Sequence, residues 1–293
     1  MKKLLSWSLS LLFSGACIVQ AEDSLRVLPH FKNHEVLLVK ELKDFQGGNL
    51  SGITYNFDTG TYFLMQNNYE TLFEYDRNFE QLRVIKMLNL EDDDTEDIVY
   101  LGDNKFALSS ETNKVIIFTL KPGQTTVDLN AARADVQLFQ LPRPGEKNQG
   151  LEGVCYTSRN TMGGGGRGRF YAVQQNRPRK VYTFVWPNND EDVRNYRYLG
   201  IQEPFDTYNL FKHRMSDLSG CTFSDATNTL LVLSHASSRI MEFSVDGKTV
   251  DTLDLPKVAP QYEGITFSPE GDLVLVSEPN IVVVLRGKTA DSE

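Results

Sequence analysis

A five-residue pattern occurs five times along this chain of 293 residues. Each copy has Ser or Glu first, then Gly or Asp, a small apolar residue, a β-forming residue and an aromatic residue. The copies are Ser51-Gly52-Ile53-Thr54-Tyr55, Glu96-Asp97-Ile98-Val99-Tyr100, Glu152-Gly153-Val154-Cys155-Tyr156, Ser219-Gly220-Cys221-Thr222-Phe223 and Glu263-Gly264-Ile265-Thr266-Phe267. Successive second positions are 45, 56, 67 and 44 residues apart. One short strand repeated with loops of varying length predicts a repeat architecture.

Three further apolar strands follow each copy, with one exception at the end of the chain. The second strands are expected at 62–67, 106–111, 170–175, 230–235 and 273–278, and the third at 72–75, 115–118, 181–184, 240–243 and 281–285. Fourth strands are expected at 82–87, 136–141, 196–201 and 250–255. Four antiparallel strands per unit predict an all-β chain, a β-propeller of five blades. Six blades are the alternative, if a long insertion hides one.

The last repeat has no fourth strand, because only a polar tail at 287–293 follows its third strand. A strand at 35–42 has no hairpin partner nearby and is expected to complete that blade. Pairing the two ends of the chain would close the ring and remove an exposed edge. The propeller is therefore assigned to residues 35–286, after a lead-in segment at 22–34.

The N-terminus reads as a signal peptide at 1–21. Lys2 and Lys3 precede a mostly apolar run from Leu4 to Val19, and Val19-Gln20-Ala21 forms a small-x-small cleavage site. The run is short for a membrane span. We expect export to the periplasm or beyond the cell, with membrane contact only if this segment is uncleaved or Cys17 is lipidated.

The charge of the chain excludes one class of partner. The formal net charge is −9, and loss of Lys2 and Lys3 would make it −11. Such an acidic chain is a poor nucleic-acid binder, because phosphates require a basic surface. A cation is the better-matched partner.

Cys155 and Cys221 would remain after cleavage. A disulfide is chemically possible outside the cytoplasm, but the two residues occupy adjacent columns of the repeat and so point to opposite faces of a strand. We expect buried free thiols.

Two rings of polar residues are expected to meet at one mouth of the propeller. In each antiparallel hairpin the start of the first strand and the end of the second lie at the same end. The first ring is Ser51, Glu96, Glu152, Ser219 and Glu263, and the second is Asn67, Glu111, Gln175, His235 and Glu278. Five carboxylates in a narrow opening repel one another unless a cation or protons compensate. Oxygen ligands favour calcium, while a single His argues against zinc.

Other interpretations of these residues stay open. A Glu before Gly can be a turn residue that accepts hydrogen bonds from backbone N–H groups linking two blades, and direct acid–base catalysis is a further option. The acidic run 91–97 leads to the same mouth and is either a solvated loop, an entry funnel or a weaker cation site. Basic residues there could hold a phosphate ester: Lys114, Arg177, Arg179, Lys180 and Arg239. No Gly-x-Ser-x-Gly elbow or metal-spaced histidine pair occurs.

Several segments together resemble the SdiA-regulated (YjiK/CarP-like) propeller family over residues 35–286. They are Asn49-Leu50-Ser51-Gly52-Ile53, Glu152-Gly153, Asp217-Leu218-Ser219-Gly220 with Leu231-Val232-Leu233-Ser234, and Glu263-Gly264 with Val276-Ser277-Glu278-Pro279-Asn280. The resemblance implies an exported bacterial propeller associated with calcium and without an established reaction. Asp97, Ser51 and Ser219 depart from the fuller repeats.

These observations predict an exported, calcium-associated propeller that serves a binding or calcium-homeostasis role through its acidic mouth. The metal ligands expected are Glu96, Glu111, Glu152, Glu263 and Glu278, with Ser51, Asn67, Gln175, Ser219 and His235 as further mouth residues. A calcium-dependent, phytase-like phosphoesterase acting on a small anionic or phosphorylated ligand is the alternative. A protein-interaction scaffold is the third reading.

Overall fold

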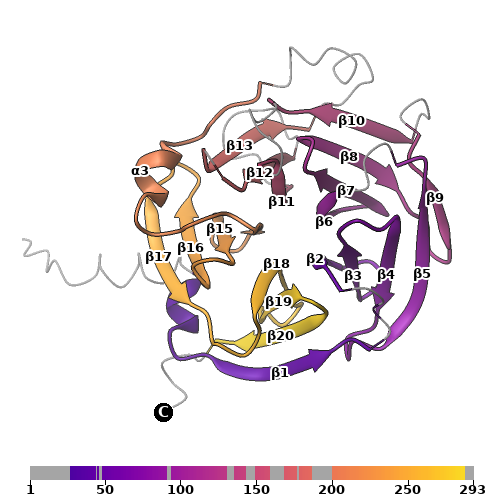
Figure 1. Cartoon of the computed structure of the whole chain (residues 1–293), viewed down its shortest axis with the longest axis horizontal. Coiled ribbons are helices and arrows are strands. Elements are labelled where there is room, and N and C mark those ends of the chain that lie inside the picture. Colours follow the sequence, from indigo (N-terminus) through magenta and orange to yellow (C-terminus); the bar gives the residue numbers. More distant parts are fainter. Residues whose placement is uncertain are drawn as a thin grey trace, which may run out of the picture.

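Five antiparallel sheets are arranged around a central axis in the computed structural model of the chain (Figure 1). The structure describes residues 27–43, 45, 48–90, 94–130, 135–142, 149–158, 168–176, 178–186 and 200–287. The signal peptide, the start of the lead-in segment and the glycine run at 163–166 lie outside these residues. The predicted five-bladed β-propeller is confirmed, and six blades are not.

The four strand positions recur in each blade. The innermost strands are β2 (Leu50–Asn56), β6 (Thr95–Gly102), β11 (Leu151–Thr157), β14 (Gly220–Ser224) and β18 (Gln261–Phe267). Next come β3 (Thr61–Gln66), β7 (Lys105–Ser110), β12 (Arg169–Gln174), β15 (Thr229–Ser234) and β19 (Leu273–Glu278). The third strands are β4 (Thr71–Tyr75), β8 (Lys114–Thr119), β13 (Lys180–Val185), β16 (Arg239–Ser244) and β20 (Ile281–Arg286). The outer strands are β5 (Gln81–Leu88), β10 (Val136–Gln140), β17 (Thr249–Asp254) and β1 (Glu35–Glu41).

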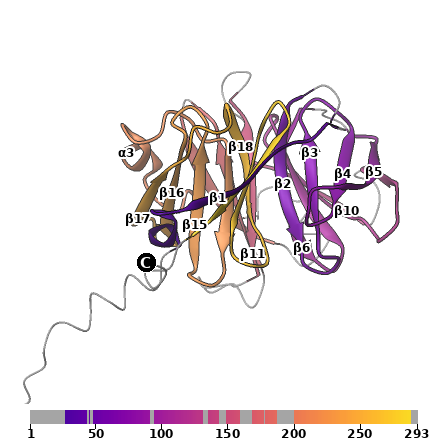
Figure 2. The ribbon, with the colours of Figure 1, turned by 90° about the horizontal axis from the view of Figure 1, so that it is seen from below.

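The N-terminal strand closes the ring, as the sequence predicts. β1 pairs antiparallel with β20, with Val39 opposite Val283 and Glu35 opposite Arg286. Figures 1 and 2 show the indigo strand along the outer edge of the yellow blade. One sheet is thus built from both ends of the described chain, and β1 covers the edge of β20 that would otherwise be exposed.

Two blades differ from the expected four-strand pattern. The strand expected at 196–201 lies mostly outside the described residues, and its blade has three strands plus an isolated bridge between Thr183 and Gln202. Another blade has a fifth strand, β9 (Thr126–Asp128), which pairs parallel with β5. Three residues inside a loop carry too little periodicity to be recognised as a strand.

The lead-in segment is docked on the propeller where the structure describes it. A 3₁₀ helix, η1 (Leu28–Phe31), buries Leu28 and Phe31. The carboxylate of the fully buried Glu242 accepts hydrogen bonds from the backbone N–H groups of Val27 and Leu28, at 2.8 and 2.9 Å. The sequence of this segment has no clear periodicity and therefore does not predict its docking. The docking depends on Glu242, which lies more than two hundred residues away in the sequence.

A short helix, α3 (Thr207–Phe211), follows residue 200, and its N-cap is Asp206. Within the described ranges no helix is long and apolar enough to cross a membrane.

The core lies between the blades. Buried side chains form five clusters, and each cluster combines residues from two neighbouring blades. The third and fifth positions of the repeat point into these clusters, as Ile53 and Tyr55 do between the first and last blades. Neighbouring blades thus stabilise each other through apolar burial.

The glycine column allows the inner strands to approach closely. A Cβ on Gly264 would lie 2.5 Å from the carbonyl oxygen of Ser51, and one on Gly220 would lie 2.5 Å from that of Glu263. A Cβ on Gly52 would lie 2.8 Å from the Cα of Asp97. These distances are shorter than real Cβ contacts, so the column has no room for a side chain.

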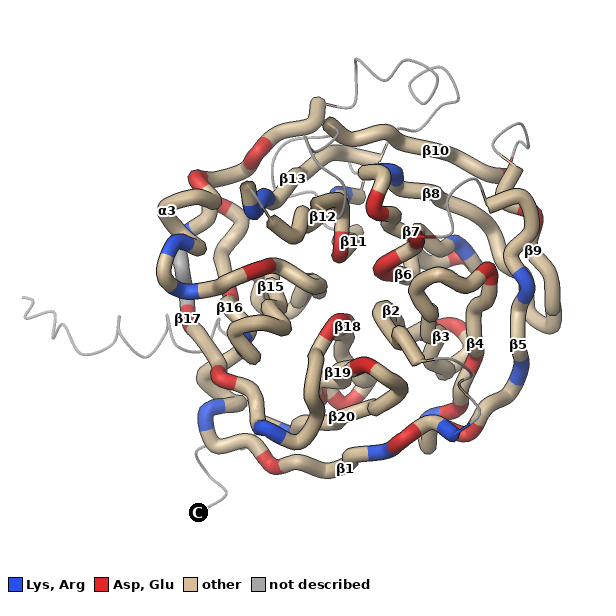
Figure 3. Tube along the Cα trace, viewed as in Figure 1, with Lys and Arg blue, Asp and Glu red and all other residues tan. Residues whose placement is uncertain are grey.

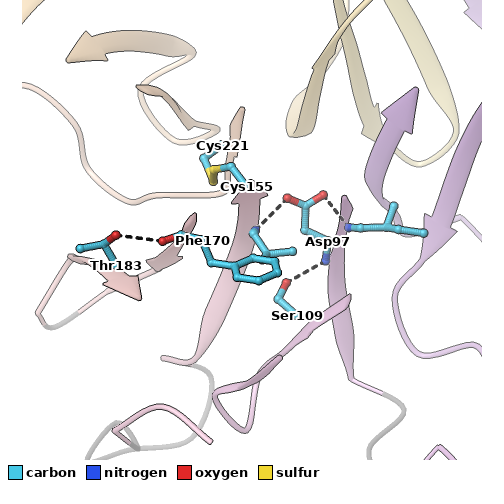
Figure 4. The surroundings of a disulfide bond; sticks show 8 residues. Asp97, Ser109, Cys155, Phe170, Thr183 and Cys221 are labelled. Atoms are coloured by element: carbon cyan, nitrogen blue, oxygen red, sulfur yellow. Dashed lines mark hydrogen bonds between the residues drawn. A yellow bond between two sulfur atoms is a disulfide. The ribbon is translucent and has the colours of Figure 1, made fainter. Parts of the chain in front are cut away.

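The expectation of free thiols is wrong, because Cys155 and Cys221 form a disulfide (Figure 4). Their Cα atoms are 5.8 Å apart. Side chains in adjacent columns of the repeat point to opposite faces only when they belong to the same sheet. Cys155 and Cys221 belong to two different sheets, on the inner strands β11 and β14 of neighbouring blades. A Cβ on Gly153 would lie 2.9 Å from the Cα of Gly220, so the two strands converge just before the cysteines. The disulfide therefore links two blades near the axis.

Candidate functional site

A backbone irregularity orients the first ring of polar residues. The pairing between the first two strands skips one residue in four of the five blades, at Ser51, Glu96, Glu152 and Glu263. An extra unpaired residue of this kind re-aims its side chain relative to the regular alternation of a strand. The repeat thus places an oxygen-bearing side chain at the same point of four blades.

The carboxylates of the two rings raise one another's pKa values at the end of the axis where the inner strands begin. We call the carboxylates of Glu96, Glu111, Glu152, Glu263 and Glu278, together with their contacts, the acidic mouth. Burial raises the pKa of Glu96 well above its usual range, and the charges of Asp94, Glu111, Glu263 and Glu278 raise it further. Figure 3 shows acidic positions around the centre of the ring on β6, β11 and β18. The charges of the five carboxylates therefore act on one another, as expected for two rings at the same end of the axis.

Glu152 is the second strongly affected carboxylate. It is 6% exposed, and burial raises its pKa well above the ordinary value. The charges of Glu96, Glu111 and Glu263 add to the shift, as does a side-chain hydrogen bond shared with Glu111. Burial also raises the pKa of Glu278, followed by the charge of Glu263, while His235 opposes the shift.

His235 supplies positive charge to one side of the mouth. Its Nδ1 lies 2.9 Å from Asp217 Oδ2 and 3.4 Å from Glu263 Oε1. The interaction with Asp217, and then that with Glu263, raises the pKa of His235 to about 10. One protonated imidazole therefore compensates Asp217 and Glu263, whereas Glu96 has no basic side chain against it among the described residues.

Asp217 is a mouth residue that the repeat does not reveal. It lies outside the five columns, just before Ser219, and it is 3% exposed. Its Oδ1 accepts hydrogen bonds from Ser234 Oγ at 2.5 Å and from the backbone N–H of Ala236 at 3.2 Å. In the sequence, Asp217 is indicated only by the segment Asp217-Leu218-Ser219-Gly220, which is part of the resemblance to the SdiA-regulated family.

The Glu96 side also holds buried oxygen atoms without partners. Asn67 donates a hydrogen bond from Nδ2 to Glu96 Oε1 at 2.7 Å, which brings its amide to the carboxylate. Asn67 Oδ1 and Ser51 Oγ are both buried, and neither has a hydrogen-bond partner among the described residues. Buried polar atoms are almost always satisfied, so these two oxygens need an explanation.

Other predicted mouth residues have structural roles. The Ser219 hydroxyl donates to the carbonyl oxygen of Tyr262 at 3.0 Å, and the backbone of Gln175 bonds to Gly150 and Leu218. Glu111 Oε2 accepts from the backbone N–H of Gly150 at 2.9 Å. Glu111, a residue of the second ring, therefore links two blades through this backbone hydrogen bond.

Asp97, which replaces the expected Gly, is a buried blade linker. Its carboxylate accepts from the backbone N–H groups of Ile98 at 2.8 Å and Val154 at 3.0 Å, and also from that of Ile53 (Figure 4). Burial raises its pKa well above the ordinary value, and the three N–H groups oppose that shift. Its side chain joins the inner strands of three blades, so the departure from the repeat has a structural purpose.

The acidic run 91–97 is only partly described, and three of the basic residues expected to hold a phosphate are engaged by other groups. Residues 91–93 and Arg177 are outside the described part, and Asp94 raises the pKa of Glu96. Lys180 pairs with Glu203, and Arg239 Nε lies 2.6 Å from Asp254. Arg179 donates to the carbonyl oxygen of Ser216 at 2.8 Å. These contacts engage three of the basic side chains proposed for phosphate.

The mouth does not contain a ready-made ligand cluster. Across the described ranges, no three His, Cys, Asp or Glu side chains are arranged so that they could hold a metal ion together. The donor chemistry nevertheless suits a hard cation, since carboxylate, amide and hydroxyl oxygens are the preferred calcium ligands. The residues fit calcium by type, and binding would require their side chains to converge.

The fold and this geometry define a class: a five-bladed β-propeller with a carboxylate-rich mouth. A family model described as SdiA-regulated matches residues 28–286, and the chain therefore belongs to the SdiA-regulated family. This confirms the resemblance found in the sequence.

Solved structures are similar to this chain. A luciferin-regenerating enzyme aligns with a TM-score of 0.50 at 13% identity, over 85% of this chain and 97% of that one. At this identity the likeness shows the propeller fold alone. A gluconolactonase from Xanthomonas campestris aligns with a TM-score of 0.47 at 9% identity, over 83% of this chain and 87% of its own.

Proposed function

We propose that this protein is an exported propeller that binds calcium at the acidic mouth. The observation that carries the proposal is the buried Glu96 carboxylate, which accepts a hydrogen bond from Asn67 while Asn67 Oδ1 is buried without a partner among the described residues; Ser51 Oγ, in the first ring of the neighbouring blade, is likewise buried and unpartnered. A cation would offset the repulsion and give both oxygens a partner. The expected ligands are Glu96, Asn67 and Ser51, with Glu152, Glu263 and Glu278 completing the charge.

Calcium matches this site better than zinc or magnesium. Zinc prefers nitrogen and sulfur ligands, and the one mouth histidine is engaged by Asp217 and Glu263. Magnesium requires near-ideal octahedral geometry, whereas calcium tolerates irregular sets of six to eight oxygen atoms. A mouth without a preformed cluster favours the more tolerant ion.

Export is supported by two observations that are independent of the mouth. The sequence begins with a signal-like segment at 1–21, and Cys155 and Cys221 form a disulfide. Disulfides persist mainly in oxidising compartments such as the periplasm or the extracellular space. A binding or calcium-homeostasis role in the cell envelope follows from that location together with the proposed ligand.

Calorimetric titration of chelator-treated protein tests the calcium proposal. We expect calcium to bind with release of protons, because binding shifts Glu96 and Glu152 to their ionised forms. Titration in two buffers of different ionisation enthalpy measures that release. Glu96→Gln should weaken binding by about tenfold or more, which is the loss of about 1.4 kcal/mol. Glu270→Gln, at the other end of the axis, is the matched control and should bind as the parent does.

The same preparation separates the alternatives. A phosphoesterase would release phosphate from an inositol phosphate only when calcium is present, and would lose that activity in Glu152→Gln. The engagement of Lys180 and Arg239 by acids favours binding without turnover. A scaffold would show no calcium uptake, and folded protein without detectable binding would end the calcium proposal.

A further inference from the structure

A second site lies at the opposite end of the central axis from the acidic mouth. The starts of the inner strands form that mouth, whereas their later residues line a cavity of about 820 Å³. Small-molecule sites typically have volumes of about 300–1,000 Å³. The cavity, which we call the distal cavity, is large enough for one compact organic ligand.

The wall of the distal cavity is formed by the fourth position of the repeat. One residue per inner strand lines it: Thr54, Val99, Cys155, Thr222 and Thr266. Small side chains at this position leave the centre of the ring open. The hydroxyl of Thr54 accepts a hydrogen bond from the backbone N–H of Tyr100 at 2.9 Å. Within the described part of the chain, the hydroxyls of Thr222 and Thr266 make no hydrogen bond, so both are available to a ligand.

Aromatic side chains from all five blades adjoin the same space. They are the fifth residues of the repeat, of which Tyr100, Tyr156 and Phe267 are partly exposed, while Tyr55 and Phe223 are buried between blades. Together with Val99 and the disulfide they make the wall mainly apolar. Aromatic walls favour flat apolar groups through offset and edge-to-face packing. The body of a suitable ligand is therefore apolar and preferably aromatic.

Two acids at the rim are neutralised by arginines. Glu270 lies 3.1 Å from Arg77, and Asp272 accepts two hydrogen bonds from Arg286, each 2.9 Å long. These acids offer little attraction to a ligand, because their charges are already compensated.

Two other rim acids are not compensated. Asp58 accepts a hydrogen bond from the Tyr100 hydroxyl, and Asp225 accepts one from Thr157 Oγ1 at 2.5 Å. Both acids line the cavity, and neither contacts Lys or Arg in the residues that the structure describes. Neutral donors hold these carboxylates in place without removing their charge. The rim therefore attracts a cation, and the nearby aromatic faces add to that attraction.

We propose that the distal cavity binds a compact amphipathic cation, with an aromatic body inside the ring and a protonated amine at the rim, beside Asp58 or Asp225. The hydroxyls of Thr222 and Thr266 accept or donate hydrogen bonds at the inner end. This site shares no residue with the acidic mouth, so it stands whether or not the mouth binds calcium.

Three probes with one apolar body and different head groups test the proposal: 1-pyrenemethylamine, 1-pyrenemethanol and 1-pyreneacetate. Fluorescence anisotropy titrations at moderate salt should give a Kd for the amine at least about tenfold lower than that for the alcohol. The acetate should bind more weakly than the alcohol. The Asp58→Asn, Asp225→Asn double variant should bind the amine and the alcohol equally, because its amides keep the hydrogen bonds but lose the charge.

Two further variants define the location. Thr222→Phe should fill the cavity and weaken all three probes by about tenfold or more. Glu80→Gln, an exposed change remote from the cavity, should leave every Kd unchanged and serves as the matched control. Equal affinities for the three head groups in the parent protein would overturn the proposal. An undiminished preference for the amine in the double variant would also overturn it, even if Thr222→Phe failed to fold.

Discussion

Single residues near the axis have separable roles, although they share columns of one repeat. Glycines of the second column allow contact between blades, as the 2.5 Å approach at Gly264 shows, while Asp97 in the same column bonds to three backbone N–H groups. In the first column, Glu96 contributes charge, whereas the Ser219 hydroxyl is used by the carbonyl oxygen of Tyr262. The repeat predicts where these side chains lie but does not predict what each one bonds to.

Gly264→Ala should destabilise the protein by about 3 kcal/mol, because its methyl group would overlap the carbonyl oxygen of Ser51 and force two inner strands apart. Urea unfolding followed by circular dichroism measures the loss. Gly123→Ala is the matched control: Gly123 has φ +79° and open space around it, so only backbone strain of about 1 kcal/mol is expected. Equal losses in the two variants would show that close packing at the axis is not what Gly264 provides.

At the scale of elements, the sequence predicted regular strands well and their exceptions poorly. Alternating apolar residues identified the innermost three strands of every blade, and the unpaired strand at 35–42 correctly indicated ring closure. The disulfide was not predicted, because the alternation of side chains applies within one sheet and these two cysteines lie on two different sheets. Strand β9 and helix η1 were missed because both depend on contacts distant in sequence. Partners of this kind cannot be read from local periodicity.

The disulfide between β11 and β14 should stabilise the folded chain by about 4 kcal/mol, the chain-entropy value for a loop of its length. Its cysteines are separated by 66 residues. A Cys155→Ser, Cys221→Ser double variant should unfold at correspondingly lower urea concentration. Reduction of the parent protein should produce the same shift, and reduction of the variant should change nothing. An identical midpoint for oxidised parent and variant would contradict a linking role for this bond.

At the scale of the whole molecule, the ring has two chemically different ends. The sequence predicted that Glu96, Glu111, Glu152, Glu263 and Glu278 share one end of the ring, because antiparallel hairpins fix which strand ends meet, and their charges do act on one another there. Their role as metal ligands stays a prediction. The distal cavity was not predicted, although its aromatic column was visible, because an aromatic column in a repeat ordinarily indicates packing. Whether side chains fill the axis or leave it open depends on blade spacing, which no single repeat encodes.

The calcium-free protein should lose stability as the pH rises above about 4.5. The folded-state pKa values of Glu96 and Glu152 are raised above the ordinary value of 4.5, so the native state holds these protons more tightly than the unfolded state does. Their contribution is complete below that pH and is lost as the pH rises through the folded-state values. The raised pKa of His235, about 10, acts in the same direction between pH 6.5 and 10.

Urea unfolding between pH 5 and pH 8, in chelator, measures this dependence. Glu152→Gln should flatten the curve, because its neutral amide has no proton to lose. Added calcium should restore stability most at the alkaline end. Stability of the calcium-free protein that rises from pH 5 to pH 8 would show that the carboxylates do not repel one another as inferred.

The most direct measurement for the central claim is a crystal structure of the protein grown with calcium. The account predicts an ion in the acidic mouth, roughly 2.3–2.6 Å from oxygen atoms of Glu96, Asn67 and Ser51. Anomalous scattering would distinguish the ion from water, and crystals of Glu96→Gln should lack it. A mouth that holds only water at saturating calcium, with Ser51 Oγ and Asn67 Oδ1 still unpartnered, would contradict the claim.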